Sequence, residues 1–470
     1  MEKLLKKLQP FMKISKGATL TSKLSMEEEN IYDLNSDNLP EAVGMVQLSP
    51  DGHLKMFGEF CEEEGEPAET MTKDDIQLLT EKFLHEIFPK AVSNLHLDAG
   101  IDLDYFYVFE YVQKDVQFNL PMPNSGISFY MFKNGSIMDM TYDMDGITIV
   151  YPDDILAAEL AREIYLENIN PELKIMRYDD ETYSNGDNSF VLVYDFFQNI
   201  GIDVKMDSTK TTLEDLGAEN VQYLTIPEVV VDPVSIYSFI NLEGMQKILV
   251  DGAIEVWSTH QHEDFDNEDL TDMDIGTADA VKIIKDLERG KLKQLTALSD
   301  EENPNLWSAE AANDKAHHIL FSQFPDAHHS FKQREYDPAI NDFDDEGEEL
   351  PPYAYQFTFD RFENGIQVAE ENIAITVSAN NLELIEYLAT DGAFDDFSNL
   401  VDSTPSNHKE AMELYEHSFE MKLHWAKDYE DDMKTSQYEL VYLPVFKASG
   451  GHVHFISANT LELWVVDVGD

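Results

Sequence analysis

The feature that most constrains the fold is a pattern of one helix followed by alternating strands between Trp307 and Phe397. Ser308 is a typical N-cap residue, apolar residues follow it at helical spacing, and Pro325 ends the helix. After an acidic loop, the aromatic residues of Tyr353–Phe359 alternate as they do in a half-buried strand. The pattern predicts an α-helix laid across an antiparallel meander.

The meander continues through Asn364-Gly365, a dipeptide typical of tight hairpin turns. In the returning strand, Ile373, Ile375 and Val377 alternate and are expected to face the helix.

The same pattern occurs earlier in the chain, which predicts an internal duplication. A helix begins after Thr72, with Asp75 three residues later, and ends at Phe88-Pro89 as the later helix ends at Phe324-Pro325. The strand from Tyr105 reads Y-F-Y-V-F-E-Y, against Y-A-Y-Q-F-T-F in the later copy. The matched positions of the following strands are Ile127, Phe129 and Met131, and an Asn134-Gly135 turn corresponds to Asn380-Asn381.

Each copy is expected to continue into a second helix and two further strands. The helices are predicted at 152–168, with Leu160 among the inward residues, and at 406–419. The strands are predicted at 189–197 and 201–206 in the first copy, and at 438–446 and 452–457 in the second. F-V-L-V-Y, ending at Tyr194, and Y-E-L-V-Y, ending at Tyr442, again match.

The segments outside the two copies have their own patterns. A hairpin is predicted at 42–60 around Pro50-Asp51-Gly52, and strands at 229–257 resemble a second version of it. Helical spacing of Ala280, Ile283, Ile284, Leu287 and Leu292 predicts a helix over 276–298 that bridges the halves. The expected domains are an N-terminal arm and hairpin (1–70), a first repeat (71–227), a connecting hairpin and helix (228–305) and a second repeat (306–470).

Composition excludes several classes of function. The chain has 470 residues and is 43% hydrophobic, enough for several buried cores. Its 93 acidic and 32 basic residues give a formal net charge of −61, which repels phosphate backbones and anionic lipid, so nucleic-acid binding is not expected. Cationic partners, including weakly bound divalent ions, remain compatible with this charge.

The compartment predicted from the sequence is the cytoplasm. Cys61 is the single cysteine, so no intramolecular disulfide can form. The N-terminal residues lack the apolar region of a signal peptide, and no run of about 18 apolar residues predicts a membrane span.

A search for catalytic motifs predicts no catalytic residue and no cofactor-binding residue. His85-Glu86 begins like a zinc-peptidase H-E-x-x-H helix, but Pro89 stands where the second histidine would be. No G-x-S-x-G elbow, P-loop or G-x-G-x-x-G motif is present. The chain is therefore expected not to be an enzyme.

Metal binding was weighed at histidine pairs and at acidic loops, and no metal ligand is predicted. His452 and His454 alternate on one strand face but lack a third ligand, and surface or interface positions are the simpler interpretation of all four pairs. The loop Asp342–Gly347 begins like an EF-hand, but Tyr353 stands where the bidentate Glu is needed. The other pairs are His260/His262, His317-His318 and His328-His329, and the other acidic loop carries Asp264, Asp266, Glu268, Asp272 and Asp274.

The aromatic stripes of the two copies permit two interpretations. Tyr105, Tyr107 and Phe109, like Tyr353, Tyr355 and Phe357 in the other copy, are compatible with a ligand cleft. A core covered by a helix explains them better, because alternating aromatic residues are typical of a strand that buries one face.

The order of these motifs resembles the YcdB/YcdC repeated domain of Bacillus-type bacteria, over roughly 72–210 and 307–468. The resemblance rests on the helix ending in Phe-Pro, the Y-x-Y-x-F strand, the Asn364-Gly365-Ile366 turn, the second helix and the L-V-Y strand, with Trp307 before the helix. The first copy departs from the pattern at Lys114-Asp115-Val116. The resemblance implies PepSY-like modules without assigned catalytic residues, and such modules occur in metallopeptidase propeptides, which implies peptidase regulation. Many relatives look exported, whereas this chain has no recognisable signal peptide.

The sequence therefore predicts an α+β protein of two tandem PepSY-like repeats, with helices packed on antiparallel β-sheets. The expected function is soluble, non-enzymatic binding of a protein or peptide, with exposed strand edges accepting a partner's strand. The alternatives are an acidic protein that binds divalent cations and a hydrolase with an unrecognised site.

Overall fold

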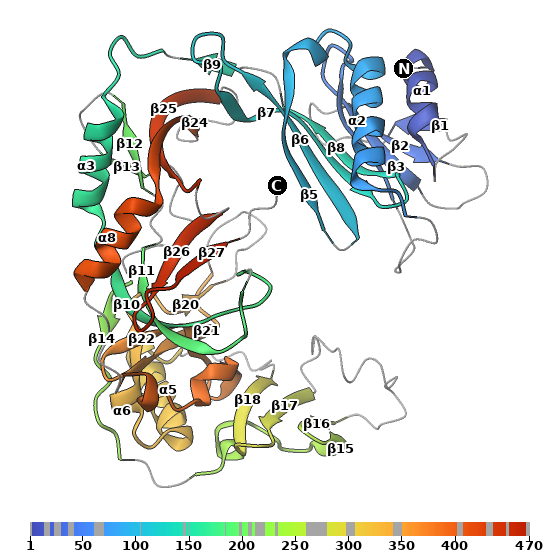
Figure 1. Cartoon of the computed structure of the whole chain (residues 1–470). Helices are drawn as coiled ribbons and strands as arrows, with labels where there is room; N and C mark the ends of the chain where they lie inside the picture. The colour runs from blue at the N-terminus through green and yellow to red at the C-terminus, as the bar shows by residue number, and fades with distance from the viewer. Residues whose placement is uncertain are drawn as a thin grey trace.

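The computed structural model describes residues 2–13, 19–22, 30–35, 42–60, 70–103, 105–143, 147–149, 151–183, 185–196, 200–204, 209–211, 221–230, 234–259, 280–297, 306–341, 350–401, 408–428, 436–447 and 451–466. Over these residues the fold is mixed α+β, with sheets of 8, 14 and 5 strands in which most neighbours are antiparallel (Figure 1). No helix in the described part of the chain has the length and apolarity needed to cross a membrane.

The N-terminal sheet is covered on one face by α2, as the sequence predicts. Thr72 caps this helix by accepting a hydrogen bond from the Asp75 N–H. The strand order is β1-β2-β3-β4-β8-β7-β6-β5. The elements are α1 (Glu2–Leu8), η1 (Gln9–Phe11), β1 (Thr19–Ser22), β2 (Asn30–Asn35), β3 (Ala42–Leu48), β4 (Leu54–Glu59), α2 (Lys73–Ile87), η2 (Val92–Asn94), β5 (Leu95–Asp102), β6 (Phe106–Lys114), β7 (Pro121–Phe132) and β8 (Ile137–Tyr142).

The second sheet repeats this order over seven strands, as β15-β16-β17-β18-β23-β22-β21. Ser308 caps its covering helix α5, and Asn364 and Gly365 both have positive φ in the β21–β22 turn. The elements are η3 (Ile236–Phe239), β15 (Gln246–Asp251), β16 (Ile254–Ser258), β17 (Ala280–Asp286), β18 (Lys291–Ala297), α5 (Ala309–Gln323), α6 (Ala327–Ser330), β19 (Phe331–Arg334), β20 (Ala339–Ile340), β21 (Ala354–Glu363), β22 (Ile366–Ser378), β23 (Leu384–Ala389) and η5 (Asp391–Phe394).

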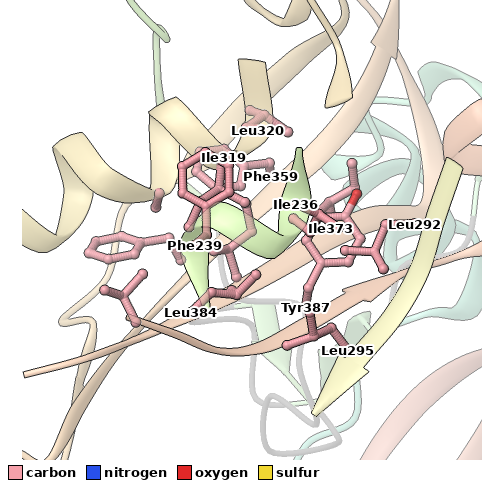
Figure 2. Close-up of a cluster of buried hydrophobic side chains, with 14 of the residues drawn as sticks. Ile236, Phe239, Leu292, Leu295, Ile319, Leu320, Phe359, Ile373, Leu384 and Tyr387 are labelled. Carbon is pink, nitrogen blue, oxygen red and sulfur yellow. The ribbon is translucent and has the colours of Figure 1, made fainter. Parts of the chain in front are cut away.

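The aromatic stripes belong to the cores beneath the two helices except at their first residues, because Tyr105 is 60% and Tyr353 45% exposed. Tyr107, Phe109 and Tyr111 are buried in the first copy, as Tyr355, Phe357 and Phe359 are in the second. Figure 2 shows the second core, where Ile319 and Leu320 of α5 lie with Phe359 of β21, Ile373 of β22 and Tyr387 of β23. The interpretation as core, rather than as a ligand cleft, holds for these buried residues.

The helix predicted over 276–298 is wrong: the described part of this range is the hairpin β17–β18. The residues at helical spacing are not the buried set, because Leu287 is 66% exposed while Val281 and Leu295 are buried. Gly290 has φ +65°, which makes the turn and is incompatible with a helix. The hairpin pairs with β23 as β3–β4 pairs with β8, so it is the counterpart of 42–60, and β15–β16 is the counterpart of β1–β2.

The second helices are present, and α3 is shorter than predicted. α3 begins at Ala158 rather than 152, because the backbone of Leu156 is bonded elsewhere: its N–H donates to Val204 O at 3.1 Å and its carbonyl accepts from Tyr442 Oη at 2.8 Å. Leu160 was predicted to face inward but is half-exposed, and Ala161 and Tyr165 face the core instead. The remaining elements are β9 (Ile147–Ile149), α3 (Ala158–Asn168), β10 (Glu172–Arg177), β11 (Phe190–Asp195), β12 (Ile200–Asp203), β13 (Thr209–Thr211), β14 (Tyr223–Leu224), α7 (Ser398–Val401), α8 (His408–Ser418), β24 (Glu420–Asp428), β25 (Ser436–Val445), β26 (His452–Ser457) and β27 (Leu463–Val466).

The C-terminal strands of the two copies are exchanged. β11 does not pair with β12; it pairs with β26 of the second copy, while β12 pairs with β25. Two matching sets of four strands result, β10-β11-β26-β27 and β24-β25-β12-β13, each with one hairpin from either copy. The two copies therefore share sheets rather than folding side by side.

A single core joins the exchanged strands. α3 and α8 lie together at its side (Figure 1), with Tyr165 Oη and Tyr415 Oη 3.0 Å apart and Arg162 bonded to Glu416. Both tyrosines are about 1% exposed and pack with residues of both copies.

Candidate functional site

The metal candidates do not form a metal centre in the described structure. No group of three or more His, Cys, Asp or Glu side chains with metal-binding geometry occurs among the described residues. The two acidic loops, 264–274 and 342–347, lie outside those residues, as do His260 and His262. His85 and Glu86 are exposed on α2.

Two of the described histidines, His317 and His454, are not fully at the surface. His317 is buried on α5, where its Nε2 lies 2.9 Å from Gln333 Oε1, while His318 is exposed. It is buried because it sits next to Ala316 on the core side of the helix, and burial lowers its pKa. His452 is exposed and His454 is half-buried, with burial and the nearby His452 lowering the pKa of His454 to about 4. The rings of His328 and His329 lie 3.8 Å apart on α6.

One buried carboxyl group that the sequence did not indicate is that of Glu371, on β22. It is buried, and its Oε2 has no hydrogen-bond partner among the described residues. Burial is the main cause that raises its pKa; Asp391 and Asp395 add to this, and bonds from Thr390 and Gly392 oppose it. Glu370, just before it, has a positive φ, so the local strand is irregular.

Glu371→Gln is expected to stabilise the chain at pH 7 and to leave its stability near pH 4 unchanged. The folded state holds the Glu371 proton more tightly than the unfolded state, so stability falls as pH rises from the unfolded pKa through the folded one. The limiting slope is about 1.4 kcal/mol per pH unit. Urea unfolding of both proteins between pH 4 and 8 measures this, and parallel pH profiles would contradict it.

The strongest candidate for recognition is β5, at the edge of the N-terminal sheet. Among the described strands its only partner is β6. Leu97 is 41% exposed, and Ile101, Leu103 and Tyr105 are exposed beside it. Asp98 forms a bulge in the pairing with β6, and Asp102 pairs with Lys133 at 2.8 Å. An edge of this kind presents unpaired backbone groups to a partner strand.

The equivalent edge of the second copy is already covered. Matching the pairing registers against β6 and β21 places Leu95–Leu97 of β5 at the positions of Phe331–Gln333, and Asp102 at that of Ala339. There the short strand β14 pairs antiparallel with β19, setting Tyr223 opposite Arg334 and Leu224 opposite Gln333.

Tyr223 of β14 makes a dense set of polar contacts. Its hydroxyl donates to Asp360 Oδ2 at 2.6 Å and accepts from Gln367 Nε2 at 2.9 Å. Arg334 Nε donates to both oxygens of Asp360, at 2.9 and 3.0 Å. The tyrosine ring packs edge-on against Phe362. Burial, and then the bond to Asp360, raise the pKa of the Tyr223 hydroxyl.

Sequence reasoning predicted strand edges as the binding device but could not say which edge is open. β14 has two residues, too few for a detectable period, and the residues around Tyr223 come from β14, β19, β21 and β22. One local signal was available: Asp360 and Arg361 stand among the aromatic residues of a buried strand, where charged groups need partners.

Comparison with known proteins gives three similarities. Residues 256–391 match the model of the YcdB, YcdC repeated domain. The chain is 22% identical over 418 residues to the uncharacterized protein YcdC of Bacillus subtilis (strain 168), covering 87% of each chain. It is also similar to the C-terminal domain of YpeB from Bacillus megaterium, at 15% identity and a TM-score of 0.28, covering 44% of this chain and 88% of that one.

Proposed function

We propose, for a chain that carries a YcdB/YcdC repeated domain and is a distant homologue of YcdC, that it is a non-enzymatic protein that binds an extended peptide segment along β5. The observation that supports this most directly is a difference in strand pairing between two equivalent sheet edges. β19 of the second copy receives an added strand, whereas β5 offers an edge without one among the described residues. The fold therefore tolerates strand addition at this position.

The side chains around β5 suggest the chemistry of the partner. Leu97 and Ile101 offer apolar contacts, and Asp98 places a carboxylate on the same strand, where Asp102 is paired with Lys133. With a net charge of −61 over the whole chain, electrostatic attraction favours a cationic partner. The expected ligand is an extended segment with alternating apolar and basic residues.

The non-enzymatic part of the proposal is supported by the position of the perturbed groups. Glu371 is buried between β22 and η5, and His317 is buried on α5 beside Gln333, so neither side chain is open to a substrate in the described structure.

We also assign the two helix-covered units to PepSY-like repeats, which is supported by a capped helix packed across an antiparallel meander in both. Peptidase regulation is a narrower form of the same proposal, in which the extended segment on β5 belongs to a peptidase.

Peptides selected for binding to the full chain by phage display test the proposal. They are expected to be rich in alternating apolar and basic residues, and to bind the double variant Leu97→Lys, Ile101→Lys at least about tenfold more weakly, because edge lysines block strand pairing. Fluorescence anisotropy of a labelled selected peptide measures the affinity, and hydrogen exchange should show new protection of the β5 amides.

Leu78→Lys provides the control, because Leu78 is an exposed apolar residue that belongs to α2 and not to β5. It should bind like the unmodified chain. If both lysine variants reduced binding equally, or if protection appeared elsewhere, the β5 assignment would be wrong.

A further inference from the structure

We infer that the edge of β19 is a second strand-binding site, built to hold a tyrosine-bearing extended segment, and that the chain's own β14 fills it in this structure. The inference rests on the strand-addition mechanism of the proposed function but concerns a different edge. Each edge can therefore fail its own test without deciding the other.

The occupant makes few backbone contacts. Tyr223 and Leu224 pair with Arg334 and Gln333, and the Glu335 N–H donates to Gln222 O at 2.8 Å. A two-residue strand contributes little pairing of its own, so the tyrosine side chain must supply most of the specificity.

The residues around the Tyr223 side chain, here called its seat, are Arg334, Asp360, Phe362 and Gln367. They favour a phenol over a phenyl ring. Asp360 is only 2% exposed, and a carboxylate buried to this extent is costly unless charged and polar donors surround it. Arg334 supplies one donor and the Tyr223 hydroxyl another, while Gln367 donates to the same hydroxyl. A phenol donates and accepts at once, which a phenylalanine ring cannot do.

The seat does not depend on β14 for its own positioning. Lys332 stands on β19, Asp360 and Phe362 on β21, and Gln367 on β22, which pair with one another or with β10 in the large sheet. Arg334, at the end of β19, is held by its bonds to Asp360. The Lys332 ammonium lies 4.0 Å from the Phe362 ring centroid and 5.9 Å from that of Tyr223. The site should therefore persist when β14 leaves it.

The first copy shows that the same sheet forms with different residues at these positions. The pairing registers place Val112 at the position of Asp360, which puts Lys114 at that of Phe362. Asp98 follows Leu97 in the chain as Arg334 follows Gln333, but it lies in the bulge of β5. The arrangement of Arg334 and Tyr223 around the buried Asp360 is thus a feature of one copy, and recognition of an added strand explains its presence there.

The chain's own segment competes with any partner. A tethered strand acts at an effective concentration on the order of millimolar, so an external segment binds the intact chain weakly unless β14 is released. The β19 edge is therefore expected to bind in trans only when Tyr223 is removed or outcompeted.

The test uses a labelled synthetic peptide with the sequence of residues 221–226, V-Q-Y-L-T-I, and the full-length variant Tyr223→Ala. The variant is expected to bind the peptide at least about tenfold more tightly than the unmodified chain does, by fluorescence anisotropy. The same peptide with phenylalanine in place of tyrosine should bind at least about tenfold more weakly to the variant. Adding Asp360→Asn to Tyr223→Ala should remove the preference for tyrosine.

The variants must first show the cooperative melting of the unmodified chain. Equal binding of the tyrosine and phenylalanine peptides by a folded Tyr223→Ala chain, or no binding of either, would overturn the inference. If Tyr223→Ala does not fold, hydrogen exchange of the unmodified chain with excess peptide decides: faster exchange at Tyr223 and Leu224 with continued protection at Gln333 supports displacement, and unchanged exchange overturns it. The lysine substitutions on β5 should not alter this binding, which separates the two edges.

Discussion

Trp425→Ala is expected to lower the free energy of unfolding by about 3–5 kcal/mol, as the loss of a large buried aromatic side chain does. Trp425 of β24 is 2% exposed and packs against Phe118 and Tyr151 of the first copy, with ring centroids 6.2 and 5.7 Å away. Its Nε1 donates to Asp115 Oδ2 at 3.0 Å. The substitution therefore opens a cavity at a contact between the two copies and removes a donor from a buried carboxylate.

Trp425 also stabilises the carboxylate of Asp115 through its hydrogen bond. Burial alone would raise the pKa of Asp115, but bonds from the Phe118 N–H, Trp425 Nε1 and the N–H groups of Leu120 and Gln117 lower it below the usual value. A buried carboxylate that loses one of these donors is left less well compensated, which adds to the cost of the cavity.

Trp425→Phe separates these two terms, because it keeps most of the ring packing and removes only the N–H. Its expected cost is about 1–3 kcal/mol, less than that of the alanine variant. Denaturant unfolding followed by circular dichroism measures both. Equal costs for the two variants would show that the Asp115 bond contributes most of the effect, and a cost below about 1 kcal/mol for alanine would contradict the predicted packing at this contact.

Local features of the fold were predictable because their causes lie within a few residues. Thr72 and Ser308 cap helices through bonds to residues three positions later, and Asn364-Gly365 turns because both residues adopt positive φ. The alternation of Tyr107, Phe109 and Tyr111 needs only one covered sheet face. For the same reason the duplication could be read from the order of these signals.

The errors occurred where distant contacts override a local pattern. The segment around Ile283 and Ile284 fits helical spacing, but β-branched residues and Gly290 allow a hairpin, and pairing with β23 selects it. α3 starts late because Val204 and Tyr442 use the backbone of Leu156. Neither contact can be inferred from the spacing of apolar residues in the sequence.

The candidate sites also combine local features, which the sequence indicates, with contacts between distant residues, which it does not. A strand with exposed apolar residues at β5 is compatible with the sequence, but whether it lies at an edge depends on the whole strand order. The seat of Tyr223 brings together residues separated by more than a hundred positions, so no spacing rule could find it. The exchange of β12 and β26 between the copies was likewise not predictable, because matching strands of the two copies could pair within a copy or between copies.

Division of the chain after Val230 should show how far the two copies depend on each other. Each fragment keeps its own helix-covered sheet, because the cores under α2 and α5 are built from residues of one fragment, apart from Ile226 and Val229 at the edge of the second. The core of the exchanged strands draws on both fragments. Separate fragments are therefore expected to keep protected amides in β6 and β21, and to lose protection in β11 and β25 by about two orders of magnitude or more.

Mixing the two fragments in equal amounts should restore that protection, because β11 regains β26 and β12 regains β25. Hydrogen exchange read by mass spectrometry measures each strand separately, with β6 and β21 as internal controls that mixing leaves unchanged. Full protection of β11 and β25 in the separate fragments would mean that each copy can pair its own strands, and the exchange would then be one of two accessible arrangements. Restoration only on mixing would mean that Tyr165 and Tyr415, 3.0 Å apart across the copies, belong to a core that neither copy can form alone.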